Sequence, residues 1–121
     1  MLRSTRREKT SAGAFNTIER KRRPTPPGEL LWEFYLEPHG VTVSIFAEAA
    51  GVSRKHMSAV INGRAAITAD LATRIATVLG TTAQFWLNLQ NAVDLYDAGR
   101  AMKSAKKRPR HLPFPKAEAA E

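Results

Sequence analysis

The stretch over residues 42–64, TVSIFAEAAGVSRKHMSAVINGR, constrains the fold of this chain more than any other. It predicts two short helices, one over 43–50 and a second that runs to about Ile61. Gly51 suits the left-handed residue that commonly follows a helix, and Asn62-Gly63 breaks the second helix. Each helix follows a residue whose hydroxyl can cap its first turn. These residues are Thr42 and Ser53.

The spacing of small, apolar and basic residues favours a helix-turn-helix. Ala47 and Gly51 lie four apart on one face, and the small Ala47 side chain lets the second helix cross closely. The residues expected in the core are Phe46, Ala50, Val52, Met57 and Val60. The opposite face of the second helix carries Arg54, Lys55, His56 and Ser58. Such a helix can enter the major groove of DNA. The alternative is an ordinary αα-hairpin inside a helical bundle.

Three further helices are predicted around this pair. One begins at Pro27 and runs to about Glu37, and another, capped by Thr68, spans 69–79. The apolar side of the first is expected to be Leu30, Leu31, Phe34 and Tyr35, with Trp32 and Leu36 partly exposed. The last helix runs from about Ala83 to Asp97, with fraying on to Ala101. An all-α fold of five helices is therefore predicted.

The last predicted helix has more apolar residues than one core-facing stripe requires. A second apolar face on a terminal helix is typical of a subunit contact. We therefore predict a homodimer whose interface contains Trp86, Leu87, Val93 and Leu95. The alternative is that Trp86 and Leu87 pack against the first helix.

Charge is distributed unevenly along the chain. Residues 1–26 hold eight Lys and Arg against two Glu, residues 27–99 hold four against seven Asp and Glu, and residues 100–121 hold seven against two Glu. A mildly acidic body with two basic arms favours a polyanion partner. The alternative is that the arms only keep the chain soluble. The predicted organisation is a basic arm without structure of its own over 1–24, a helix-turn-helix domain over 25–100 and a basic, Pro-containing tail over 101–121.

Composition excludes several classes of protein. The chain has 121 residues and no cysteine, which indicates one domain without a disulfide framework or a thiolate metal site. No apolar run approaches the roughly 18 residues of a membrane span. The basic N-terminus lacks the apolar segment of a secretory signal. We expect a cytoplasmic protein that is not associated with a membrane.

Residues able to support catalysis or bind a metal are missing from the pattern. The three histidines, His39, His56 and His111, are scattered and have no metal-ligand spacing. None lies beside a candidate nucleophile, and there is no Gly-rich phosphate loop. We therefore predict no enzyme activity, no metal and no cofactor.

Several motifs between residues 25 and 98 resemble those of one known family. They are Pro27-Gly28-Glu29-Leu30-Leu31 with Glu37-Pro38, the turn Ala47 to Ser53, Asn62-Gly63-Arg64, Ile67-Thr68-Ala69-Asp70, and Gly80-Thr81-Thr82-Ala83-Gln84-Phe85-Trp86-Leu87-Asn88-Leu89-Gln90. The block from Ile67 to Gln90 is the most specific. Together these motifs resemble the HigA/VapI-type antitoxin family of the Xre/Cro repressor-like superfamily. The resemblance implies a lambda-repressor-like fold and a bacterial protein associated with the nucleoid.

The resemblance also implies a function and a set of site residues. Family members are typically dimers that bind double-stranded operator DNA, repress their own operon and neutralise an mRNA-cleaving, HigB-type RNase toxin. By position, the residues that match base-reading sites are Arg54, Lys55, Ser58 and Ala59. The residues that match sites at the DNA backbone are Thr42, Val43, Ser53, Asn62 and Arg64. Val43 and Ala59 depart from the family pattern, because neither has a polar side chain.

Three other functions are compatible with the sequence. The first is a stand-alone Xre-family regulator without a toxin, which would share the whole body. The second is a protein-binding module that uses the apolar helices, although such a module would not need the exposed Arg54, Lys55 and Ser58. The third is RNA binding through the arms, which lack aromatic residues on which bases could stack.

Overall fold

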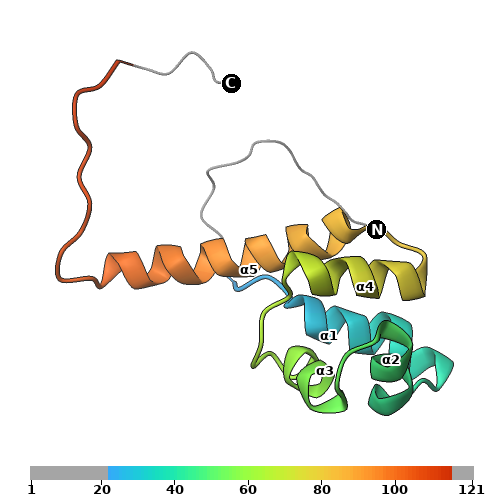
Figure 1. Cartoon of the computed structure of the whole chain (residues 1–121). Coiled ribbons are helices and arrows are strands. Elements are labelled where there is room, and N and C mark those ends of the chain that lie inside the picture. The colour runs from blue at the N-terminus through green and yellow to red at the C-terminus, as the bar shows by residue number, and fades with distance from the viewer. Residues whose placement is uncertain (1–21, 116–121) are drawn as a thin grey trace, which may run out of the picture.

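The chain forms an all-α body in the computed structural model, which describes residues 22–115 (Figure 1). Within those residues there are helices and no strands, so the predicted fold class is confirmed. Apart from residues 22–24, the predicted basic arm lies outside the described residues, as does the end of the tail beyond residue 115. The helical segments are α1 (Pro27–Leu31), η2 (Trp32–Leu36), η3 (Glu37–His39), α2 (Val43–Ala50), α3 (Arg54–Ile61), α4 (Ala69–Leu79) and α5 (Ala83–Lys103).

Hydroxyl caps fix where the four longer helices begin. In each case the side-chain oxygen of the residue before the helix accepts a hydrogen bond from the backbone N–H three residues ahead. The caps are Thr42, Ser53, Thr68 and Thr82, at 3.2, 3.0, 3.2 and 3.1 Å. Gly51 then ends α2 with φ of 75°, a conformation that residues with a side chain rarely adopt. The predicted caps and turn of the helix-turn-helix are therefore present.

The first predicted helix is a continuous helical run with a π-helical turn in the middle. At η2 the Glu37 N–H donates to the Trp32 carbonyl oxygen, five residues back. This wider turn places Leu31 and Leu36, five apart, on the same buried face. Phe34, expected in the core from a 3.6-residue period, is 64% exposed instead. The predictions for Phe34 and Leu36 were therefore wrong, because the extra residue shifts the helical phase.

One hydrophobic core joins all five α-helices. Trp86 of α5 is fully buried at its centre, 5.6 Å from the Tyr35 ring of η2 between centroids. The indole Nε1 donates to Thr81 Oγ1 at 2.8 Å, so its polar group is satisfied. Other large, fully buried side chains are Phe46, Leu31, Leu36, Met57, Leu71, Ile75 and Val60. The first part of α5 packs beside α4, whereas its C-terminal part projects beyond the body (Figure 1).

Candidate DNA-binding surface

One side of α3 holds the chain's predicted base-reading residues. Arg54 and Lys55 are exposed in the first turn of the helix. Ser58 and Ala59, both half-buried, lie one turn further on, and residues three and four apart share a helical face. Met57 and Val60, on the opposite side of α3, are buried in the core. Within residues 22–115, no ion pair involves Arg54 or Lys55. Their charges are therefore available to a polyanion.

The two cap hydroxyls carry donors suited to phosphate. Thr42 Oγ1 and Ser53 Oγ each accept a helix N–H, which leaves their own O–H hydrogens for another acceptor. Val43 offers only an apolar side chain, but it is the first residue of α2, where the N–H has no intrahelical partner. Both helices also present the positive end of their dipole here. This edge can therefore bind an anion through both hydroxyl and backbone donors.

The backbone N–H groups of the turn that follows α3, residues 63–65, already donate hydrogen bonds within the chain. The N–H groups of Gly63, Arg64 and Ala65 donate to the carbonyl oxygens of Val60 and Ala59, at 3.1, 2.7 and 3.2 Å. Because those N–H groups are engaged, the group of this turn that can donate to a phosphate is the exposed Arg64 side chain. Asn62 is exposed at the predicted position, but its side-chain amide donates to Ser58 of the same helix.

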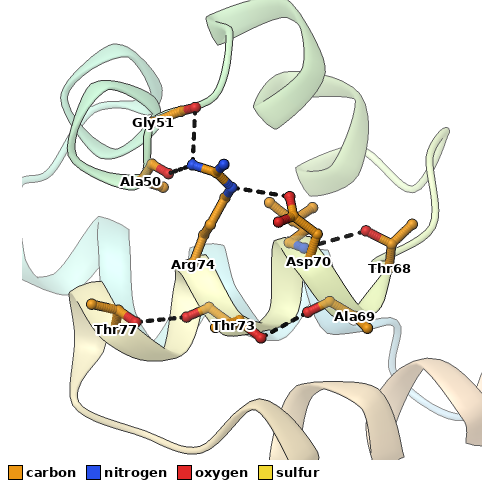
Figure 2. Close-up of polar contacts among 9 residues, drawn as sticks. Ala50, Gly51, Thr68, Ala69, Asp70, Thr73, Arg74 and Thr77 are labelled. Atoms are coloured by element: carbon orange, nitrogen blue, oxygen red, sulfur yellow. Dashed lines mark hydrogen bonds and ion pairs between the residues drawn. The ribbon is translucent and has the colours of Figure 1, made fainter.

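Arg74 of α4 contacts the end of α2 and the turn of the helix-turn-helix, as Figure 2 shows. Its Nη1 donates to the Ala50 and Gly51 carbonyl oxygens, at 3.0 and 3.3 Å. Its Nε donates to Asp70 Oδ2 at 3.0 Å, within α4. Arg74 therefore satisfies carbonyl groups that the end of α2 would otherwise leave without a partner. Sequence reasoning missed this residue, because nothing local in α4 indicates a contact with the turn.

Gln90 of α5 holds the loop between α3 and α4. Its side chain is 9% exposed, and its Oε1 accepts from the Ile67 N–H at 2.9 Å. Its Nε2 donates to Asp94 Oδ1 at 2.9 Å. The loop that carries Arg64 is thereby fixed to α5. A glutamine within the apolar pattern of α5 was the available signal, but its partner 23 residues away could not be read from the sequence.

The predicted subunit contact is only partly accessible in the chain. Trp86 and Val93 are buried in the chain's own core and offer no side-chain surface to a partner, which corrects that part of the prediction. Trp86 instead packs against η2, the alternative considered above. Leu87 is half-buried, and Leu95 is 73% exposed. Met102, seven residues beyond Leu95 and so on the same side of α5, is 48% exposed.

A bidentate ion pair joins the two ends of the domain. Arg23 Nε and Nη2 donate to the Asp97 carboxylate of α5 at 2.9 and 2.8 Å. These hydrogen bonds, which outweigh the effect of desolvation, hold the pKa of Asp97 below its usual range. Both side chains are about half exposed, at 48% and 50%. The pair fixes where the basic N-terminal segment meets the body.

Residues 22–115 lack two features of other protein classes. In that part of the chain, no three His, Cys, Asp or Glu side chains gather into a group that could hold a metal ion. None of its helices is both long and apolar enough to cross a membrane.

Comparisons with known proteins agree with this geometry. A helix-turn-helix family model matches residues 34–86. Antitoxin HigA-1 of Vibrio cholerae is 51% identical over 77 residues, covering 64% of this chain and 72% of that protein. The uncharacterized HTH-type transcriptional regulator YbaQ of Escherichia coli is 43% identical over 83 residues, covering 69% and 74%. A solved structure of Pseudomonas aeruginosa antitoxin HigA with the higBA promoter aligns with a TM-score of 0.62 and 31% identity, covering 72% and 98%.

Proposed function

Because this chain belongs to the HigA/VapI-type antitoxin family of Xre/Cro-like helix-turn-helix proteins, we propose that it represses its own operon and neutralises a toxin encoded beside it. Its relatives are DNA-binding antitoxins and regulators rather than enzymes. The observation that carries the DNA-binding part of the proposal is the exposed Arg54 and Lys55 at the start of α3, which form no ion pair within residues 22–115. The relative solved with its promoter supports the same use of this fold.

In the proposed complex, α3 enters the major groove with its N-terminal end toward the bases. Arg54 can bond guanine O6 and N7 together, and Lys55 and Ser58 can bond single base atoms. Ala59 offers a methyl contact, which suits thymine. The hydroxyls of Thr42 and Ser53, the N–H groups at the start of α2 and the Arg64 guanidinium hold the phosphates on either side.

The basic arms add affinity without sequence preference. Residues of the described tail from Lys106 to Arg110 are exposed, and four of these five are Lys or Arg. Each Lys or Arg that meets a phosphate releases counterions and steepens the salt dependence of binding by about 0.9 in log–log slope. Both arms therefore strengthen binding to operator and random DNA together.

A toxin partner would contact the acidic body rather than the arms. The first helical run exposes Glu29, Glu33 and Glu37, and α2 exposes Glu48. Toxins of this family are usually basic, and opposite charge favours their encounter with such a surface. Co-expression of the full chain with the product of the adjacent reading frame tests this partner. A copurified complex that survives deletion of the arms is expected, and a complex lost with the arms would contradict the assignment.

A stand-alone regulator is the second candidate function. The observation in its favour is the similarity to YbaQ, a relative named as a transcriptional regulator and not as an antitoxin. Both candidates require the same DNA-binding surface. They differ in the adjacent reading frame, which encodes a small basic RNase only in the first case.

The DNA-binding assignment is tested by comparing Arg54→Ala with Arg64→Ala. Loss of a base-reading Arg54 should lower affinity for the operator by roughly 1–3 kcal/mol while leaving affinity for random duplex nearly unchanged. Loss of a phosphate-binding Arg64 should weaken both by a similar factor and reduce the salt slope by about one. The measurement is binding to operator and random duplexes at several salt concentrations. Equal losses on both duplexes for Arg54→Ala would rule out its role as a base reader.

A further inference from the structure

Asn62, the residue that ends α3, directs its side-chain amide nitrogen back toward Ser58 of the helix. Nδ2 donates to the Ser58 carbonyl oxygen at 2.9 Å and to Ser58 Oγ at 3.3 Å. The backbone N–H of Asn62 donates to the same carbonyl oxygen at 3.0 Å. The side-chain amide that could donate to a phosphate oxygen is therefore engaged with Ser58 in the chain itself.

The Ser58 hydroxyl lies on the predicted base-reading side of α3. Ser58 lies one turn beyond Arg54 and Lys55 on the same side of α3 and is half-buried. A hydroxyl has one hydrogen to donate and two lone pairs. One lone pair receives Asn62 Nδ2, and within residues 22–115 the Ser58 hydroxyl donates no hydrogen bond. The common alternative, donation to the carbonyl oxygen four residues earlier, is not made. Its hydrogen is therefore available to a further acceptor.

We propose that Asn62 is a positioning residue that makes the Ser58 hydroxyl a hydrogen-bond donor toward the bases. This inference rests on the proposed function, in which α3 enters the major groove. A serine alone can pair with a donor or with an acceptor on a base edge. Once a lone pair is occupied, the hydroxyl prefers an acceptor such as guanine O6 or N7, adenine N7 or thymine O4. Its one remaining lone pair makes the amino group of cytosine the poorer partner.

The test uses the full chain and begins with selection of duplexes from a random-sequence library. Affinity is then measured for all four base pairs at each half-site position, for the unchanged chain, Asn62→Ala, Ser58→Ala and the double variant. At one position we expect a preference of about 2- to 10-fold for an acceptor over cytosine, the range of one hydrogen bond. Asn62→Ala and Ser58→Ala should each remove most of it. Adding Asn62→Ala to Ser58→Ala should change the preference no further, because the two residues act together.

Asn62→Asp supplies a sharper comparison at nearly the same side-chain volume. A carboxylate only accepts hydrogen bonds, so the Ser58 hydroxyl should turn its hydrogen toward residue 62 and present its lone pairs to the bases. The preference at that position should then move toward a base with an amino group. The added negative charge weakens binding to every duplex, and for this reason the readout is the ratio between bases within one variant.

Thermal unfolding separates positioning from folding. Asn62→Ala removes a contact at the end of α3 and should lower the unfolding temperature. If Asn62→Ala does not fold, the base preference is measured with Ser58→Ala and Asn62→Asp instead. An unchanged base preference in folded Asn62→Ala, or an equal effect of Asn62→Ala in the Ser58→Ala background, would overturn the inference alone. Failure of the unchanged chain to select any sequence would overturn the proposed function and this inference with it.

Discussion

Gly28 lies where α1 crosses the last turn of α3. A Cβ added there would overlap the Val60 carbonyl oxygen and lie 2.8 Å from Ile61 Cα, both backbone atoms that cannot move aside locally. We expect Gly28→Ala to cost about 3 kcal/mol or more of unfolding free energy, at or beyond the upper end for overpacking. Urea denaturation followed by circular dichroism measures it. Operator affinity should fall as well, because α3 must shift.

Gly99 of α5 provides a matched control for this substitution. Among the described residues, no atom beyond the neighbouring helix backbone lies within 4 Å of a Cβ added at Gly99, and its backbone is helical. Alanine there should therefore stabilise the chain by roughly 0.5–1 kcal/mol, the usual advantage of Ala over Gly in a helix. Similar losses at both glycines would show that the Gly28 contact with α3 is not what limits side-chain size.

Arg74 is expected to stabilise the turn through carbonyl groups and not through its ion pair. Arg74→Met removes the bonds to Ala50 and Gly51 and should cost about 1–3 kcal/mol in thermal or urea unfolding. Asp70→Asn removes only the exposed pair partner and should cost less than about 1 kcal/mol. Arg74→Lys should recover only part of the loss, since an ammonium lacks the fork geometry. A larger effect for Asp70→Asn than for Arg74→Met would reverse this assignment.

At the scale of elements, α5 controls the position of the α3–α4 loop through Gln90. Gln90→Leu leaves the Ile67 N–H buried without its acceptor, at a cost of about 1–3 kcal/mol. We also expect faster amide hydrogen exchange at Ile67, because opening of the loop becomes easier. Exchange followed by NMR at that amide measures both effects.

Asp94 separates the two hydrogen bonds of Gln90. Asp94→Ala removes the acceptor of Gln90 Nε2 but keeps the bond to Ile67. Exchange at Ile67 should then stay close to that of the unchanged chain. If Asp94→Ala accelerated exchange as much as Gln90→Leu, the direct bond to the loop would not be what holds it.

Local chemistry explains which elements could be predicted from the sequence. The caps Thr42 and Ser53 and the glycine after α2 act on their own neighbours, so their positions follow from a few adjacent residues. The exposed face of α3 follows equally from its period. The π-helical turn does not, because counting by 3.6 residues assigns Phe34 to the core and Leu36 to its margin.

Other features could not be predicted from the sequence because they depend on tertiary contacts. α5 is apolar on several sides, so its sequence could not indicate that Trp86 and Val93 face the core while Leu95 faces outward. The roles of Arg74 and Gln90 depend on partners more than 20 residues away. For Asn62 the position was predicted, but the direction of its amide depends on a side-chain rotamer.

At the scale of the whole molecule, pH should act on the Arg23–Asp97 pair only in acid. The pKa of Asp97 is lower in the folded chain than its ordinary value in the unfolded chain. The stabilisation is therefore present above an ordinary carboxyl pKa of about 3.9 and is lost as pH falls through the lowered value. NMR titration of the Asp97 carboxyl carbon should show this shift. Arg23→Gln should restore an ordinary pKa and Arg22→Gln should not, and equal effects would exclude a specific pair.

Dimer formation is also a property of the whole molecule. The exposed Leu95 and Met102 provide an apolar stripe on the projecting part of α5, which we propose as the contact with a second copy. Leu95→Asp should give a monomer in sedimentation at micromolar concentration. It should also lose the cooperative use of two half-sites about one helical turn, 34–36 Å, apart. Phe34→Asp, at an exposed phenylalanine on η2, should remain dimeric. Monomers from Phe34→Asp alone would place the contact elsewhere.

The pairing of Arg23 with Asp97 also determines where the two basic arms join the body. The N-terminal arm joins it beside α5, and the C-terminal arm follows the end of the same helix. Asp97 and the last residue of α5, Lys103, are six residues apart, or about 9 Å along a helix. If the chain binds DNA as proposed, two basic arms attached so close together should meet the same stretch of duplex. Once one arm is bound, the other searches a small volume, and its effective concentration near the phosphates is high. The arms of one subunit should therefore engage DNA as a bivalent unit, and removal of either would weaken the hold of the one that remains.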